Sequence, residues 1–187
     1  MPFSVVKRWR LTNAGLGATI SNAISRLPYM SACKVALEYK TRFWEHLDNP
    51  IIGSCSTSTD IPGIGSVCYP SYNINGTGKG SILASYVSGP DLGQRWASVP
   101  EEEHVAYVQN AMVEIHGEVA RKQYTGKYSR VCWLLDPLES GGWASPAVGQ
   151  HELYLPEYFK THNNVSCHTH LRFFSLMALT RFFSSVR

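Results

Sequence analysis

The chain has few charged residues and no long apolar run. These two features argue against a nucleic-acid-binding protein and against a membrane-spanning protein. Charged residues make up 17% of the 187 residues, and the formal net charge is only +3. The Lys and Arg residues are scattered rather than gathered into a stripe, so a nucleic-acid partner is not expected. No stretch approaches the roughly 20 apolar residues of a membrane-spanning helix. The residues before the basic run at Lys7 are too few for the apolar core of a signal peptide. We therefore expect no membrane span and take the cytoplasm as the default compartment.

The cysteines also lack a recognisable pattern. They number five, are widely spaced and contain no C-x-x-C pair, at Cys33, Cys55, Cys68, Cys132 and Cys167. Such spacing indicates neither a disulfide framework nor a zinc ribbon. We expect most of them to be buried as small hydrophobic side chains.

What the chain does contain is alternation typical of strands. Hydrophobic residues at 44% predict a folded domain. In residues 33–39, Val35 and Leu37 fall on one side and Lys34 on the other, which predicts a half-buried strand. Further strands are expected at 51–56, 65–70, 81–87 and 130–134, and residues 75–80 should form a glycine-rich loop between two antiparallel strands.

Two helices are predicted beside these strands. Apolar residues recur every three or four positions over 100–118, and a second helix is expected at 19–26. Ser98 and Glu101 have the spacing of a capping box at the start of the longer helix. Together these elements predict an α+β fold, with a mixed, largely antiparallel sheet and helices on one face.

The most specific stretch begins with the predicted strand. Residues 33–45 read CKVALEYKTRFWE, a strand with a lysine that continues into Arg-Phe-Trp-Glu. This segment resembles a signature of the flavin-containing amine oxidases. The likeness continues in order and spacing at 82–86, 96–97, 114–117, 133, 136–137, 140–142, 146 and 149–150. It covers about residues 1–164, and among subfamilies the chain is most similar to fungal L-amino-acid oxidases.

The resemblance implies roles for five residues. Lys34 matches the family's strand lysine, which holds a water beside the reactive nitrogen of the flavin. Trp133 matches an aromatic position that shapes the substrate cage, and Tyr86, Gly141 and Gly142 would also face substrate or flavin. A charged lysine is costly to bury, so Lys34 should face a wet cavity or be partly deprotonated. From the pattern alone, the alternatives are a solvent-facing lysine on an edge strand and a tryptophan packed in the core.

The family's reaction is the oxidative deamination of an amine or L-amino acid, in which FAD takes up a hydride and hydrogen peroxide is formed. The resemblance therefore implies FAD as the cofactor and a small-molecule amine or amino acid as the substrate. No G-x-G-x-x-G turn, which receives the FAD pyrophosphate in this family, precedes Cys33. We accordingly expect residues 1–164 to be a partial amine oxidase domain, its substrate-binding part, that is inactive alone.

The last residues read differently from the rest. Residues 165–187 form an atypical basic, Phe-rich tail without a carboxylate, where the family instead has a Gly-Glu-x-Thr stretch. We interpret the tail as the product of a wrong reading frame or an unspliced intron. The alternative function is a non-catalytic interaction module that docks through Phe173, Phe174, Phe182 and Phe183. A metal site at His162, Cys167, His168 and His170 fits no standard zinc spacing.

Overall fold

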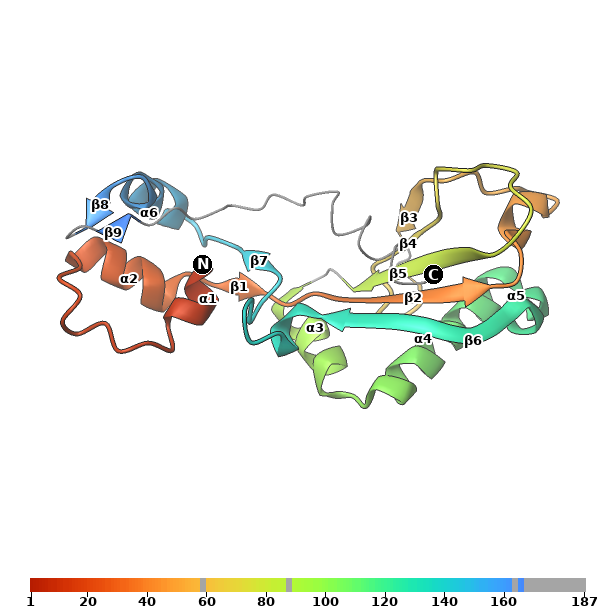
Figure 1. Ribbon diagram of the computed structural model, residues 1–187, viewed down its shortest axis with the longest axis horizontal. Coiled ribbons are helices and arrows are strands. Elements are labelled where there is room, and N and C mark those ends of the chain that lie inside the picture. Colours follow the sequence, from red (N-terminus) through yellow and green to blue (C-terminus); the bar gives the residue numbers. More distant parts are fainter. Residues whose placement is uncertain (58–59, 87–88, 163–164, 167–187) are drawn as a thin grey trace.

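The protein is elongated, with a helical end and a sheet end joined by a narrow two-stranded ribbon (Figure 1). The computed structural model describes residues 1–57, 60–86, 89–162 and 165–166. The tail beyond residue 166, with its Phe and His residues, lies outside these ranges.

The sheet end is built on five antiparallel strands in the order β3-β4-β5-β2-β6. They are β2 (Cys33–Tyr39), β3 (Cys55–Thr57), β4 (Ser66–Cys68), β5 (Gly80–Tyr86) and β6 (Tyr124–Cys132). Strand β2 is central, because it pairs with β5 on one side and with β6 on the other. Strand β6 pairs only with β2 within the described part of the sheet, so it forms one edge.

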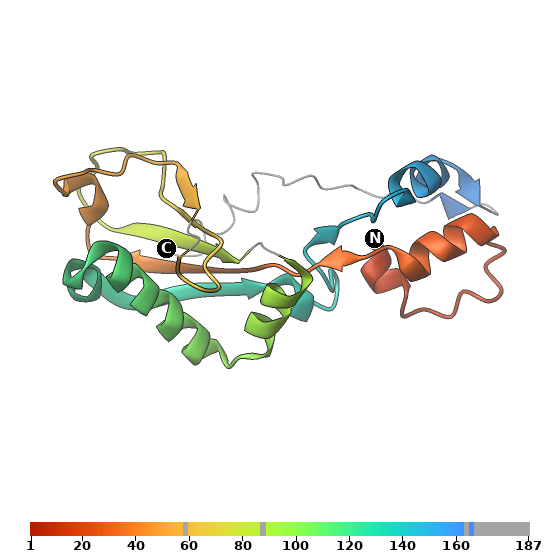
Figure 2. The same cartoon turned by 180° about the vertical axis from the view of Figure 1, so that it is seen from behind.

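Helices cover one face of this sheet, as Figures 1 and 2 both show. They are α3 (Gly89–Ser98), α4 (Glu101–His116) and α5 (Glu118–Gln123). Val35 and Leu37 of β2 are fully buried in one cluster with Val108 and Met112 of α4. Each such side chain stabilises the fold by about 1.5–3 kcal/mol through the apolar surface it removes from water. The alternating apolar side chains of β2 therefore pack in the main core against the apolar side chains that recur every three or four residues along α4.

The helical end has its own core. It consists of α1 (Phe3–Val6), α2 (Ala18–Arg26), α6 (Gln150–Tyr158) and the short pair β8 (Thr161–His162) and β9 (Val165–Ser166). Phe3 and Tyr158 meet edge to face, with 5.4 Å between ring centroids, over Ile20 and Ile24 of α2. The ribbon of β1 (Tyr29–Met30) and β7 (Trp143–Ala144) connects this end to the sheet.

The predicted α+β class, the helices on one face and both predicted helices are confirmed. The expected sheet was mixed and largely antiparallel. In the structure, every pairing among the described strands of the sheet is antiparallel. The glycine-rich loop does connect β4 to β5, with positive φ at Asn75 (59°) and Gly78 (134°). It leads into a strand rather than a helix, so its amides do not form the helix-terminal cradle that binds phosphate.

The capping box predicted at Ser98 and Glu101 is wrong. Ser98 is the last residue of α3, and its hydroxyl donates to the Arg95 carbonyl at 2.7 Å. Pro100 occupies the N-cap position of α4 and makes no side-chain capping bond. A second helix ends directly before α4, so the serine satisfies the end of that helix instead.

The expectation of no disulfide framework is also wrong. Cys33 bonds to Cys132 and Cys55 bonds to Cys68, each pair with Cα atoms 4.0 Å apart. Both pairs lie directly opposite each other in antiparallel register, Cys33 on Cys132 across β2 and β6, and Cys55 on Cys68 across β3 and β4. Strand register brings these cysteines together, and spacing along the chain does not encode register.

A buried histidine should make stability depend on pH. His104 is fully buried in α4, and its Nδ1 accepts a hydrogen bond from Arg130 Nε at 2.9 Å. Burial, and then the charge of Arg130, lower the pKa of His104 to about 4. The unfolded chain binds the proton at about pH 6.5. The contribution of neutral His104 is therefore fully present above that pH and is lost as the pH falls toward 4.

We expect this group to account for about 3 kcal/mol of the fall in unfolding free energy between pH 7 and pH 4. Urea unfolding of the wild type and of His104→Gln at several pH values measures it, because glutamine can still accept from Arg130 but does not titrate. His151→Gln, on the exposed surface of α6, is the control and should keep the wild-type pH dependence. Equal pH dependence of the wild type and His104→Gln would contradict the assignment.

No helix within the described ranges is both long enough and apolar enough to span a membrane.

Candidate active site

Lys34 lies in the central strand of the sheet, next to the first residue of that strand, on the face opposite the helices. It follows Cys33 in β2, between Ser85 of β5 and Val131 of β6 in the strand register. Ala36 lies two residues after Lys34 in β2 and pairs with Leu83 of β5. These two residues form a small apolar cluster separate from the main core. The predicted orientation, away from Val35 and Leu37, is therefore confirmed. The alternative of an edge-strand lysine does not hold, because β2 is a central strand.

Trp133 lies beside Lys34. It begins the short 3-10 helix η2 (Trp133–Leu135), directly after β6 ends at Cys132. The Lys34 Nζ lies 5.6 Å from the centroid of a Trp133 ring, close enough for a cation–π interaction. Trp133 is half-buried and belongs to neither of the large cores, so it is not the core tryptophan of the alternative interpretation.

The surroundings of Lys34 act on its amine in two opposite ways. The residue is half-buried, and this desolvation lowers the pKa of its amine. Desolvation penalises the charged amine and causes the lowered pKa, whereas the electron-rich face of the Trp133 ring attracts a cation. An amine in this position can donate hydrogen bonds to a water or ligand.

The two glycines predicted to face substrate or flavin lie next to Trp133. Gly141 N–H donates to the Trp133 carbonyl at 3.2 Å, and Gly142 N–H donates to the Met30 carbonyl at 2.7 Å. A Cβ on Gly142 would lie 2.8 Å from the Cβ of Ala32, so no larger residue fits without movement. Close packing of the loop explains these glycines by itself, and a role toward the flavin stays a prediction.

The fifth predicted residue, Tyr86, is at the same end of the sheet. It is the last residue of β5 and is paired with Cys33 in the register. Lys34, Trp133, Tyr86 and the two glycines therefore gather where β2 begins and where β5 and β6 end.

Tyr69 and His162, one of the residues considered for a metal site, lie elsewhere. Tyr69 is buried in the main core, where its hydroxyl is hydrogen-bonded to His116 Nε2 at 2.8 Å, and burial raises its pKa to about 12. No group of three or more possible metal ligands occurs among the described residues. Of the four candidates at the end of the chain, His162 is bonded to the Glu157 carbonyl at 3.0 Å. The other three lie beyond the described ranges.

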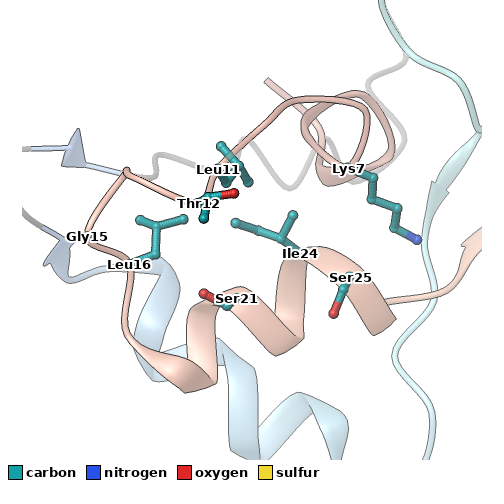
Figure 3. A pocket seen from close by; sticks show the side chains of 8 residues that line it. All are labelled: Lys7, Leu11, Thr12, Gly15, Leu16, Ser21, Ile24 and Ser25. Carbon is teal, nitrogen blue, oxygen red and sulfur yellow. The ribbon is translucent and has the colours of Figure 1, made fainter.

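A depression in the described structure lies away from this site. It has a volume of about 610 Å³ and lies between the loop after α1 and helix α2, at the helical end (Figure 3). It is lined by Lys7, Leu11, Thr12, Gly15, Leu16, Ser21, Ile24 and Ser25. Lys7 at its rim already donates to the Leu27 carbonyl at 3.1 Å. None of the predicted site residues lines this depression.

Comparison with known proteins gives a consistent result. A family model described as flavin containing amine oxidoreductase matches residues 1–178. The chain is 70% identical to an L-amino-acid oxidase of Neurospora crassa over 168 residues, which are 88% of this chain and 24% of that protein. It is 33% identical to an L-amino-acid oxidase of Siganus canaliculatus over 144 residues, 76% of this chain and 26% of the relative. The chain thus spans about a quarter of the length of these relatives.

The fold is also that of solved amine oxidases. Cyclohexylamine oxidase from Brevibacterium oxydans superposes with a TM-score of 0.71 over 89% of this chain and 35% of that structure, at 15% sequence identity. An identity this low supports the shared fold alone, whereas the family match covers nearly the whole sequence. The chain therefore belongs to the family of flavin-containing amine oxidoreductases.

Proposed function

We propose that this chain supplies the lysine side of the active site of an FAD-dependent oxidase that deaminates L-amino acids. One observation carries the proposal: Lys34 projects from a central strand and has its Nζ 5.6 Å from the ring of Trp133. A hydrogen-bond donor and a flat aromatic wall then face the same space, away from the helix-packed core. Residues 1–164 are, in this proposal, the substrate-binding part of the oxidase.

In this proposal, the residues of the site border a flavin ring. When bound, FAD would supply the acceptor for the hydride that leaves the substrate α-carbon. Lys34 would hold and orient a water at the flavin, since its desolvated amine has a lowered pKa and keeps its hydrogen-bonding capacity. Trp133 would restrict the substrate to one orientation, because a rigid ring aligns a small molecule at little entropic cost. Tyr86, Gly141 and Gly142 would border the same space.

The substrate class follows from the relatives. Proteins named L-amino-acid oxidase share 70% and 33% identity with this chain. The solved cyclohexylamine oxidase shares 15%. We therefore favour an L-amino acid over a simple amine as the substrate.

A segment exchange tests the proposal. The matched 168-residue segment of the Neurospora crassa L-amino-acid oxidase would be replaced by the corresponding residues of this chain. We expect the chimera to retain flavin through desalting and to release hydrogen peroxide from L-amino acids, within roughly tenfold of the parent rate, because most positions are unchanged. A folded chimera that retains flavin but oxidises no L-amino acid would refute the function. Oxidation of simple amines alone would refute the substrate class.

A further inference from the structure

We propose that the Cys33–Cys132 disulfide is a positioning element that holds Trp133 against Lys34. The inference rests on the proposed function for the roles of Lys34 and Trp133, and it adds the covalent link that fixes their relative position. The link is direct in sequence, because Cys33 immediately precedes Lys34 and Cys132 immediately precedes Trp133.

The geometry shows why such a link matters. Cys132 is the last residue of β6, which is an edge strand paired only with β2 in the described sheet. Ends of edge strands open most easily, since few hydrogen bonds and little burial hold them. Trp133 is the next residue; it belongs to η2 and is no longer paired with a strand. Without a crosslink, opening at Cys132 would move the Trp133 ring first.

Hydrogen bonds within the described ranges hold only the backbone of Trp133. Its N–H donates to the Ala32 carbonyl at 3.0 Å, and its carbonyl accepts from the N–H groups of Asp136 and Gly141, each at 3.2 Å. Beyond it, the side chain of Leu135 is 58% exposed. The disulfide is buried on the core face, where Cys33 is fully buried and Cys132 is 7% exposed. It therefore ties a half-exposed turn to the best-packed strand of the sheet.

The second disulfide is a matched contrast in the same sheet. Cys55–Cys68 joins β3 and β4 at the opposite edge, across the same antiparallel register and with the same 4.0 Å between Cα atoms. None of the predicted site residues adjoins Cys55 or Cys68 in the sequence. Removing it should weaken the fold and leave the distance between Lys34 and Trp133 unchanged.

The readout is the coupling between the two side chains in the full 187-residue chain. Labelling with 5-fluorotryptophan gives a ¹⁹F signal for Trp133, assigned by its loss in Trp133→Phe. The ¹⁹F chemical shift of Trp133 is followed as a function of pH in the wild type and in Lys34→Met. The part of the pH-dependent change that is lost in Lys34→Met arises from the lysine amine beside the ring, and this part is the coupling between the two side chains. This measurement does not require flavin, so it tests positioning even if the proposed oxidase function fails.

We expect the double variant Cys33→Ala/Cys132→Ala to lose most of the Lys34-dependent titration of Trp133. The control Cys55→Ala/Cys68→Ala should keep it, although thermal unfolding temperatures should fall in both. If the first variant does not fold, the control variant is treated with a phosphine reductant under native conditions. Because the control variant lacks Cys55 and Cys68, Cys33–Cys132 is the only disulfide among its described residues that the reductant can open. Loss of the coupling on reduction supports the proposal. A folded variant, or a reduced chain, with the coupling intact overturns it.

Discussion

Replacing Lys34 with methionine should lower the turnover of the chimeric oxidase by roughly 100-fold, since a positioned donor at the reacting centre commonly contributes that much. Methionine has a similar length and keeps the packing beside Trp133, but it cannot donate a hydrogen bond to a water. The loss should appear in kcat, measured by hydrogen peroxide release, with flavin content unchanged. Burial disfavours the charged amine of Lys34, so the substitution should not destabilise the fold.

The matched control is Lys122→Met. Lys122 lies on the exposed surface of α5, on the helix side of the sheet, and should tolerate the same change with unaltered turnover. Full activity of Lys34→Met, or an equal loss in both variants, would contradict a specific role for Lys34.

The largest effect on stability is expected from Arg42→Met. Arg42 and Glu45 form an ion pair whose side chains are 3% and 0% exposed. Arg42 Nε donates to Glu45 Oε1 at 2.8 Å, and its Nη2 donates to the Pro70 carbonyl at 3.2 Å. The other Glu45 oxygen accepts from Asn75 N–H at 2.8 Å. The hydrogen bonds from Arg42 lower the pKa of Glu45 despite its burial.

Removal of Arg42 would leave the Glu45 charge buried without its counterion, and would also free the loop before β5. We expect the unfolding free energy to fall by about 3–5 kcal/mol, measured by urea denaturation with circular dichroism. Arg121→Met is the control, because Arg121 and Glu118 form a pair with the same three-residue spacing but 54% and 65% exposure. Its expected cost is under about 1 kcal/mol. Similar small losses in both variants would show that the buried pair contributes little.

The sequence predicted best the elements in which apolar residues recur at a regular spacing and are buried on one face. Val35 and Leu37 alternate with Lys34, and the observed strand has the predicted limits, Cys33–Tyr39. The helix expected at 100–118 is observed at Glu101–His116. Short strands were less accurate. The strand expected at 130–134 begins at Tyr124, and Trp133 already lies in a 3-10 turn.

What the sequence did not predict depends on pairing between distant segments. The orientation of Lys34 follows from alternation, but its contact with Trp133 requires the register between β2 and β6. The same register makes a disulfide of Cys33 and Cys132, two cysteines with no motif between them. The family resemblance pointed to Lys34 and Trp133 separately, and the structure brings them together.

A crystal structure of the chimera with FAD bound tests the proposed role of Lys34 most directly. We expect the Lys34 amine to be hydrogen-bonded through a water to the flavin ring, with the Trp133 ring forming a wall of the same cavity. A flavin bound elsewhere, with Lys34 in contact with bulk solvent alone, would contradict it.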